Sequence, residues 1–434
     1  MKDNYEELQC GQDPEDSRWS SLLTLWHGDV KTILRLRSVQ AMRLQTSKRP
    51  YDSKAHVMPV MGLWHLKYNL LKLIHRLHFG GNRPIDQSCL QYAADKWDRT
   101  NANMVNDFQK LEELLIHSYQ SRVLGLLLHE SGRVFLRRDE AEEWITNMPM
   151  EEFVQRVNKV VQMINPPDFD HLDAPEPHNE QWYNHQCFIR HMDVYFLLRG
   201  AIKTADIGVL KEALRETCIL FQAKEGRCDN YSPELLRLLH TSNSPAASNR
   251  LQQAIIRNSI VNLTGKSDRT FEVDRLVEFL NRLVSITKKN RANSTKPMET
   301  LLRQITLTAP YALKLKMTLE ETFGRKYKGR HPLKEASEDI WLMATALCHD
   351  SFQEKDQQQW TAYLSTNLRR EGLRSLGENV QKYNERLDLA IPSEDDMEQV
   401  DNTDQIDAED SADGWNDADI GIDDVMESLL ADIY

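Results

Sequence analysis

Side chains able to do chemistry gather after two short apolar runs of this sequence. Asp29 comes shortly after the run Leu22–Trp26, and His65 follows the run His56–Met61. Both runs are typical of strands. A carboxylate at a strand end is well placed to hold Mg²⁺, because strand ends meet at one edge of a sheet and hard cations prefer carboxylate oxygens. Asp29 meets this positional requirement, and an N-cap of the following helix is the ordinary alternative.

His65, Lys67 and Asn69 come early in the helix predicted after the second run. The spacing of four places His65 and Asn69 on one helical face. His65 could order a metal-bound water or contact a phosphate. The ordinary alternative is a packed histidine that satisfies a backbone carbonyl.

Glu234 opens a later predicted helix, directly after Pro233. Proline suits the first helical turn, and the helix dipole favours a carboxylate there. The functional alternative makes Glu234 a late metal-binding carboxylate. Asp29, Glu234 and His65 are therefore the candidate catalytic residues, and Asp29 and Glu234 the candidate metal ligands. No cofactor is expected otherwise, and Mg²⁺ or Mn²⁺ only if the catalytic hypothesis holds.

Three other patterns are weaker. Asp274, Glu278 and Asn281 share one face of a predicted helix, which we interpret as solvated or hydrogen-bonded rather than as a site. The turn at 261–266 lacks the spacing of a nucleotide-binding loop. A histidine and cysteine cluster at 178–191 matches no standard zinc module. Its members are His178, His185, Cys187 and His191.

The elements that must position these residues are one α/β unit and many helices. After Asp29 the pattern predicts an amphipathic helix that carries Arg35, Arg37 and Arg43, and after the second strand a helix that ends at Gly80. Downstream the period is helical almost throughout. Helices are expected at 106–128, 150–164, 206–222, 232–242, 248–261, 273–289, 297–305, 337–347 and 358–370, with a loop at 165–181.

Charge is distributed unevenly along the 434 residues, whose net charge is −12. Residues 393–434 hold 16 Asp or Glu and no Lys or Arg, which leaves 54 basic and 50 acidic residues before them. A body of about +4 does not exclude phosphate partners. The tail is expected to be disordered, with apolar residues near its end that suit a short partner-binding helix or are incidental.

Several long segments resemble an uncharacterised fungal family with a domain of unknown function (DUF6589-like), suspected of transposon origin. They include WHGDVKTILRLRSVQAMR at 26–43, PVMGLWHLKYNLLKLIHRLHFGG at 59–81, NYSPELLRLL at 230–239 and IVNLTGKSDRTFEVDRLVEFLN at 260–281. The resemblance runs from about Trp19 to Leu347. The layout is also similar to transposases with a ribonuclease-H-like core.

In that similarity Asp29 matches the second metal-binding aspartate, and His65 and Asn69 match a later motif together with Trp64. Glu234 is assigned as the final acidic residue. The first catalytic aspartate has no clear counterpart, since similar sequences have a D-N-x-N pattern there and the polar leader offers only Asp3-Asn4. The chain is therefore expected to be the C-terminal part of a longer ancestor, and its catalytic residues to be vestigial.

The expected fold is predominantly α, with a partial ribonuclease-H-like α/β core. The expected parts are a polar leader (1–18), the partial core (19–82), a helical body (83–350), a helical extension (351–392) and the acidic tail (393–434). Six scattered cysteines, no signal peptide and no apolar run of about 20 residues favour an intracellular protein, nuclear or cytoplasmic, without a membrane partner.

Three functions are compatible with these patterns. The favoured one is a transposase-derived protein that has lost catalysis and binds DNA, RNA or protein. The expected nucleic-acid-binding residues are Arg35, Arg37, Arg43, Lys67 and Asn69. The alternatives are an active metal-dependent nuclease or transposase, and a helical scaffold whose acidic tail binds a protein partner.

Overall fold

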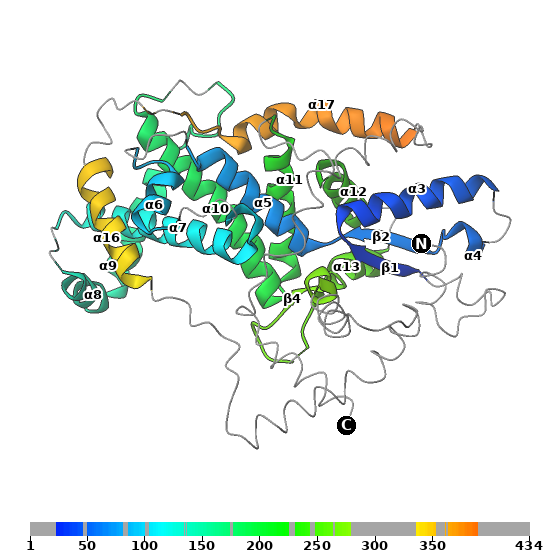
Figure 1. Ribbon diagram of the computed structural model, residues 1–434, viewed down its shortest axis with the longest axis horizontal. Coiled ribbons are helices and arrows are strands. Elements are labelled where there is room, and N and C mark those ends of the chain that lie inside the picture. The colour runs from blue at the N-terminus through cyan, green and yellow to red at the C-terminus, as the bar shows by residue number, and fades with distance from the viewer. Residues whose placement is uncertain are drawn as a thin grey trace, which may run out of the picture.

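A computed structural model describes most of the chain between residues 23 and 388 (Figure 1). The described residues are 23–46, 50–80, 86–99, 104–133, 135, 137–173, 177–224, 231–243, 248–263, 265–278, 336–352, 361 and 363–388. The predicted leader (1–18), the acidic tail (393–434) and Asn281 lie outside them. The structure is predominantly helical, which confirms the expected class. The ribonuclease-H-like core stays a prediction.

The α/β unit consists of two parallel strands joined by a helix. Strand β1 (Thr24–Gly28) pairs with β2 (Val57–Met61), and α3 (Val30–Thr46) and the short α4 (Pro50–Ser53) connect them. The register joins Gly28 to Met61, and the Gly62 amide donates to the Gly28 carbonyl at 2.8 Å. Both strands therefore end at the same level, and the residues that follow them share one edge. The first strand begins two residues later than the sequence pattern predicts.

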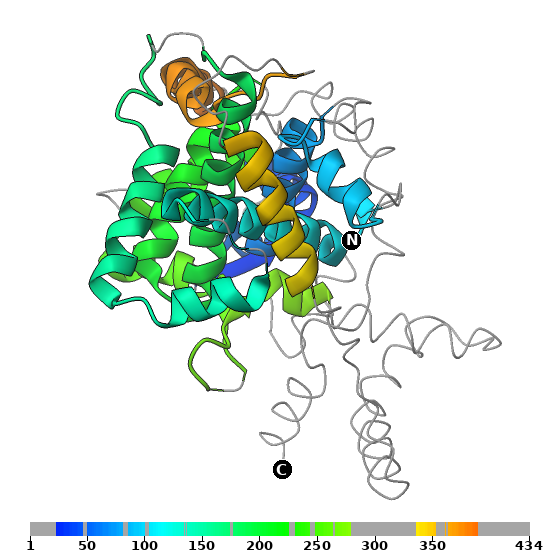
Figure 2. The same ribbon diagram turned by 90° about the vertical axis from the view of Figure 1, so that its left-hand side faces the viewer.

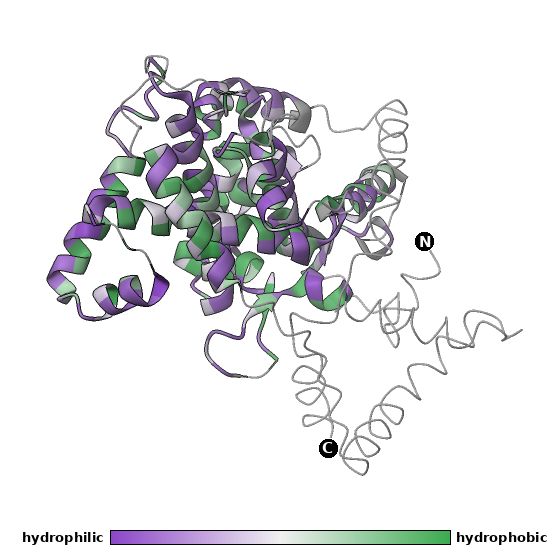
Figure 3. Cartoon of the chain, turned by 60° about the vertical axis from the view of Figure 1, so that its left-hand side comes forward, coloured by the Kyte–Doolittle hydropathy of each residue, from purple (hydrophilic) through white to green (hydrophobic). Residues whose placement is uncertain are grey.

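Helices of the body pack around a common apolar core. They are α5 (Leu63–His78), α6 (Leu90–Lys96), α7 (Phe108–Ser131), α9 (Met150–Ile164), α10 (Glu180–Thr204), α11 (Ile207–Gln222), α12 (Tyr231–Asn243) and α13 (Asn249–Arg257), with a 3₁₀ turn at Met104–Asn106. Helix α8 (Arg138–Thr146) instead buries Ala141 in a separate small cluster with Leu128 and Trp341. In α5 the predicted face is buried at Leu66, Leu70, Leu73 and Ile74. Figure 3 shows hydrophobic residues concentrated along the central helices.

Side-chain caps explain where several helices begin. Asp107, Asn179, Asp206 and Ser248 each accept a hydrogen bond from an amide in the first turn of the helix that follows. Such caps satisfy amides that have no partner within the helix. After α7, Gly132 adopts φ +66°, a left-handed conformation that favours glycine at a helix end.

A second, antiparallel sheet follows α13. Strand β3 (Ile260–Val261) pairs with β4 (Phe271–Glu272), and residues 273–278 are helical. The pattern at 248–261 predicted one continuous helix, which is wrong at its end. The helix ends at Arg257. The Ser259 hydroxyl donates a hydrogen bond to the Ile255 carbonyl at 3.0 Å, directly before the strand begins.

The C-terminal helices return to the body. α16 (Ser337–Ala346) lies against α7 and continues into a π-helical turn (Leu347–Phe352), and α17 (Leu368–Asp388) lies along α11 (Figures 1 and 2). The helix predicted at 358–370 is wrong for 363–367, which precede α17 without helical structure. Among the described helices, none is long and apolar enough to cross a membrane.

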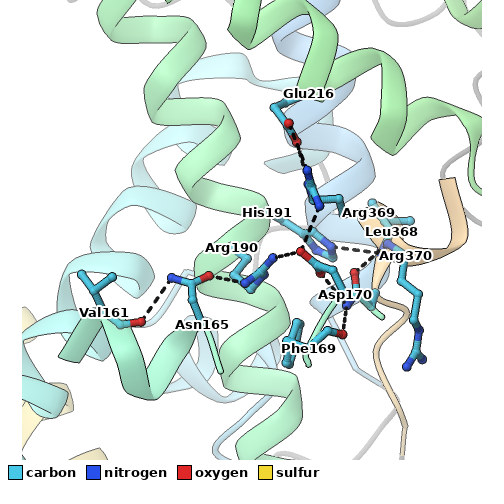
Figure 4. A network of polar contacts seen from close by, with 11 residues as sticks. Val161, Asn165, Phe169, Asp170, Arg190, His191, Glu216, Leu368, Arg369 and Arg370 are labelled. Carbon is cyan, nitrogen blue, oxygen red and sulfur yellow. Dashed lines mark hydrogen bonds and ion pairs between the residues drawn. The ribbon is translucent and has the colours of Figure 1, made fainter. Parts of the chain in front are cut away.

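A polar network fixes the start of α17 to the body (Figure 4). Arg369 Nε lies 2.9 Å from Glu216 Oε2, and its Nη1 lies 3.1 Å from Asp170 Oδ2. Arg190 of α10 also pairs with Asp170. Farther along α17, Gly372 lies so close to the Ile219 carbonyl that a larger residue would overlap it. Helix α17, within the expected extension, therefore packs against α11.

Candidate carboxylate and histidine site

Asp29 lies at the common edge where β1 and β2 end. Its Oδ1 accepts a hydrogen bond from the Thr32 amide at 2.9 Å, so the N-cap interpretation is confirmed. Among the described residues, this is the one hydrogen bond recorded for that carboxylate. The side chain is half-buried. Asp29 therefore caps α3, and its carboxylate lies at the edge where the strands end.

Asp274 caps a helix that is more than two hundred residues earlier in the chain. Its Oδ1 accepts from the Trp64 amide at 3.1 Å, and its Oδ2 accepts from the His65 amide at 3.1 Å. Gly62, at the N-cap position of α5, has no side chain to do this. Burial alone would raise the pKa of Asp274, but these hydrogen bonds and the charge of His65 lower it overall.

The same carboxylate orients the His65 ring. His65 Nδ1 lies 3.0 Å from Asp274 Oδ2, which leaves Nε2 for another partner. Burial would lower the pKa of His65, but the hydrogen bond and charge of Asp274 outweigh it, and Asp29 and Glu278 raise it further. The pKa of His65 is therefore raised by one carboxylate in direct contact, Asp274, and by the charges of two others.

Glu278 lies one helical turn after Asp274 on the same helical segment. Burial raises the pKa of its carboxyl group, the charge of His65 opposes that rise, and the negative charges of Asp29 and Asp274 add to it. Mutual repulsion of carboxylates is relieved by a shared proton or a bound cation. Among hydrogen bonds within the described residues, both oxygens of Asp274 accept from backbone amides, whereas those of Asp29 and Glu278 do not.

No group of three or more His, Cys, Asp or Glu within the described part of the chain is arranged to hold a metal ion by itself. Asp274 explains part of this, because both of its oxygens accept hydrogen bonds from α5. Any cation here would have Asp29 and Glu278 as its protein ligands and would need further ligands from elsewhere.

The structure does not place Glu234 with Asp29. Its carboxylate is buried and lies against Arg37, with Nη2 to Oε2 at 2.8 Å and Nε to Oε1 at 3.0 Å. Arg37 also donates to the Pro59 carbonyl at 3.2 Å. The backbone of Arg37 lies eight residues beyond Asp29, roughly 12 Å along α3, and the pair contacts β2 at Pro59 rather than at the strand end.

The other expected nucleic-acid-binding residues are also engaged within the fold. Lys67 is buried, with its Nζ 2.5 Å from Glu272 Oε1. Asn69 Nδ2 donates to the His65 carbonyl at 2.9 Å, and Arg43 Nη1 donates to the Asp52 carbonyl at 3.2 Å. Arg35 lies on α3 and is half-buried. The described structure does not gather these five residues on one surface.

The histidine and cysteine cluster does not converge. His185, Cys187 and His191 are buried along α10, whereas His178 is exposed before it. His191 Nδ1 lies 2.9 Å from His78 Nε2, and His185 Nδ1 accepts from Arg122 at 3.1 Å. The weak zinc hypothesis gains no ligand set here.

Asp274 and Glu278 are the site residues that the sequence patterns did not assign. The hydrogen-bonded role expected for their helical face is correct for Asp274. Its contact with His65 was not visible, because it spans 209 residues and depends on the two-residue strands β3 and β4. The available signal was a carboxylate pair one turn apart directly after a short β-prone segment.

Fold and site together define a predominantly helical protein with one parallel β–α–β unit and a carboxylate and histidine site at its strand edge. A family model matches residues 1–331, and the chain belongs to that family, a family of unknown function (DUF6589). Neither curated proteins nor solved structures gave a match to the chain.

Proposed function

We propose that this chain is a transposase-derived, ribonuclease-H-like protein that binds nucleic acid through a divalent cation shared by Asp29 and Glu278. The observation that carries the proposal is the hydrogen-bonded His65–Asp274 pair after β2, with Asp29 following β1 at the same edge and Glu278 one helical turn from Asp274. The charges of Asp29 and Glu278 both raise the pKa of His65. Glu278 takes the role that the sequence pattern suggested for Glu234, whose carboxylate is paired with Arg37.

Phosphodiester groups suit such a site because Mg²⁺ commonly uses one or two carboxylates together with substrate phosphates. The described residues offer two suitable carboxylates and no complete metal site. The cation is therefore expected to bind weakly to the free protein and more tightly when a phosphate supplies the missing ligands. His65 stands beside the same position and can donate a hydrogen bond to a phosphate oxygen.

Transposon origin is the evolutionary part of the proposal, and a fungal source goes with it. It is supported by the resemblance of the strand-end Asp29 and the following Trp64-His65 element to transposase motifs. Glu278, a helical carboxylate that comes late in the sequence, corresponds in this proposal to the final acidic residue of those transposases. Loss of catalysis is supported by the count of suitable carboxylates, because two-metal chemistry usually needs more ligands than two.

Hydrolysis is the second candidate, and the His65–Asp274 pair favours it. A histidine whose Nδ1 is held by a buried carboxylate is the arrangement that prepares Nε2 for proton transfer. In this version His65 exchanges a proton with the attacking water or the leaving oxygen. The cation would stabilise the charge that develops on the phosphate.

Binding of labelled DNA and RNA oligonucleotides, with Mg²⁺ or with EDTA at fixed ionic strength, tests the first candidate. We expect at least tenfold tighter binding with Mg²⁺, equivalent to about 1.4 kcal/mol. The Asp29→Asn and Glu278→Gln variants should lose this gain. Asn keeps the cap on α3, so folding is preserved. Asp139→Asn, on the exposed surface of α8, is the matched control.

Equal affinity with Mg²⁺ and EDTA in the wild type would overturn the cation-dependent proposal. Incubation of the same oligonucleotides with Mg²⁺ or Mn²⁺ separates the two candidates. Cleavage that is lost in both Asp29→Asn and His65→Gln supports hydrolysis. Cation-dependent binding without cleavage supports the catalytically inactive protein.

A further inference from the structure

A hollow of about 560 Å³ lies between one face of β1 and one face of α13. Alternate residues of the strand region, Leu23, Leu25 and His27, line one wall, as the two-residue period of a strand requires. Leu251 and Ala254 line the opposite wall. The volume falls within the range of small-molecule sites, about 300–1,000 Å³.

Polar groups lie among these apolar walls. Arg250 and Asn258 belong to the α13 side of the hollow. On the β1 side, His27 Nε2 is buried and has no hydrogen-bond partner among the described residues, while its Nδ1 lies 3.5 Å from Ser259 Oγ. A ring nitrogen of histidine can donate or accept a hydrogen bond, depending on the tautomer.

The hollow adjoins the carboxylate and histidine site. His27 precedes Asp29 by two residues, and its ring lies 3.5 Å from Ser259, whose carbonyl accepts a hydrogen bond from the amide of Val273, directly before Asp274. A chain that passes its phosphate over Asp29 and Glu278 would bring the neighbouring sugar and base to this opening. Apolar walls suit the faces of a base, polar groups suit its edge, and Arg250 suits an adjoining phosphate.

We propose that the hollow between β1 and α13 binds the nucleoside next to the phosphodiester held at Asp29 and Glu278. The inference rests on the proposed function for its placement beside a phosphodiester. Its own ligand is an unpaired nucleoside, because a base within a duplex is stacked and cannot enter a hollow of this kind. Single-stranded nucleic acid is therefore the substrate class of the site.

Nucleosides and nucleoside 5′-monophosphates in EDTA are the probes, observed by NMR of the labelled protein. We expect shifts at Leu25, His27 and Ala254 with millimolar nucleoside and tighter binding of the monophosphates. Ala254→Trp fills the hollow and should weaken binding at least tenfold. Gln253→Trp, on the exposed face of the same helix, is the control. Arg250→Ala should remove the advantage of the monophosphate and leave nucleoside binding unchanged.

The two proposals can fail separately, because nucleoside binding is measured without a cation and also in Asp29→Asn. No shifts at the hollow, or equal binding by wild type and Ala254→Trp, overturns the nucleoside site even where cation-dependent binding is found. If Ala254→Trp does not fold, the shift map of the wild type and the Arg250→Ala comparison decide. Nucleoside binding without cation-dependent binding would support the nucleoside site and overturn the proposed phosphodiester site at Asp29 and Glu278.

Discussion

The charges of three carboxylates raise the pKa of His65, and these carboxylates have different roles. Asp274 is saturated by two amides of α5 and the His65 ring, so it positions the histidine. One carboxylate oxygen of Asp29 accepts a hydrogen bond from the Thr32 amide. Glu278 completes the group, and burial keeps the pKa of its carboxyl raised. The negative charge that remains for a ligand therefore resides on Asp29 and Glu278.

Asp274→Asn is expected to lower both stability and the pKa of His65. The amide keeps one acceptor but loses the charge that holds the imidazolium, and its NH₂ group faces the donors of α5. We expect a loss of about 2 kcal/mol, since an unmatched buried donor costs about 1–3 kcal/mol.

Urea denaturation and an NMR pH titration of His65 measure these two effects. Because the folded pKa of His65 is raised, its stabilising contribution is complete below the unfolded pKa and is lost as pH rises through the folded pKa. Asp274→Asn should remove that dependence. An unchanged His65 pKa would show that Asp274 does not set it.

Glu234→Gln distinguishes a structural carboxylate from a metal ligand. Its loss leaves the Arg37 guanidinium buried without its partner, and we expect about 2 kcal/mol of destabilisation, reduced from the 3–5 kcal/mol of fully buried pairs because Arg37 is 23% exposed. Cation-dependent oligonucleotide affinity should stay unchanged.

Thermal unfolding and the binding assay are the readouts for this variant. Glu212→Gln breaks an exposed pair with Arg215 and should leave the melting temperature unchanged. Loss of cation dependence in Glu234→Gln with normal stability would restore Glu234 as the late ligand.

Periodicity and length determine which helices and strands can be predicted from the sequence. The helix at 150–164 agrees with α9 at both ends, because an apolar stripe and two following prolines mark it. The 25-residue helix α10 was missed, because its buried face carries His185, His191 and other polar residues. The apolar period therefore does not identify it.

The same dependence on periodicity and length explains which site residues could be predicted from the sequence. Asp29 and His65 follow strands of five residues, which are long enough to read from the sequence. The position of Glu278 depends on the pairing of β3 with β4. These strands have two residues each, so the sequence shows almost no periodic signal for them. Long-range pairing, rather than local propensity, decides the final member of the site.

Gly62→Ala tests how closely two elements must approach. The backbone at Gly62, φ −72° and ψ 136°, suits alanine, but a Cβ would lie 2.7 Å from the Asp274 Cβ and closer still to its carboxylate. The segment 271–278 must then move away from α5. We expect a loss of about 1–3 kcal/mol, a His65 pKa nearer its ordinary value and weaker cation dependence.

Gly200→Ala is the matched control, because nothing lies within 4 Å of its added Cβ on α10. Alanine there should raise stability by about 0.5–1 kcal/mol through helix propensity. Denaturation and the His65 titration again supply the measurements. Wild-type behaviour of Gly62→Ala in both would mean that the close contact with Asp274 is not required.

Across the whole molecule, the body is held together by a polar centre inside its apolar core. The Arg122 guanidinium is fully buried, donates to the Ser88 carbonyl at 3.0 Å and lies over the Phe188 ring. His78, from α5, meets His191 of α10. The Leu368 amide at the start of α17 lies 3.4 Å from His191 Nε2. Helices from distant parts of the chain therefore depend on neutral imidazoles.

This centre makes the fold sensitive to acid. Burial lowers the pKa of His78, and the charges of His191, Arg122 and His185 add to it. Burial and the charge of Arg122 lower the pKa of His185, and burial lowers the pKa of His191 to about 3. Since the unfolded chain binds protons near pH 6.5 and the folded chain does not, stability is complete above that pH and falls as pH drops below it. Each buried imidazole should cost about 2 kcal/mol between pH 7 and pH 5. His65 works in the opposite direction, but burial also lowers the pKa of His27, His75 and His117, so His65 is one group against six among the described residues.

Urea denaturation at pH 7.5, 6 and 5 measures this loss, in a range where most carboxylates stay ionised and contribute little. His191→Gln should be less stable at pH 7.5 and lose less stability on acidification, because one proton-binding difference has been removed. His178→Gln, at an exposed position, should follow the wild type at every pH. Equal stability of the wild type at pH 7.5 and pH 5 would contradict the neutral imidazole centre, since the folded state would then bind as many protons as the unfolded one.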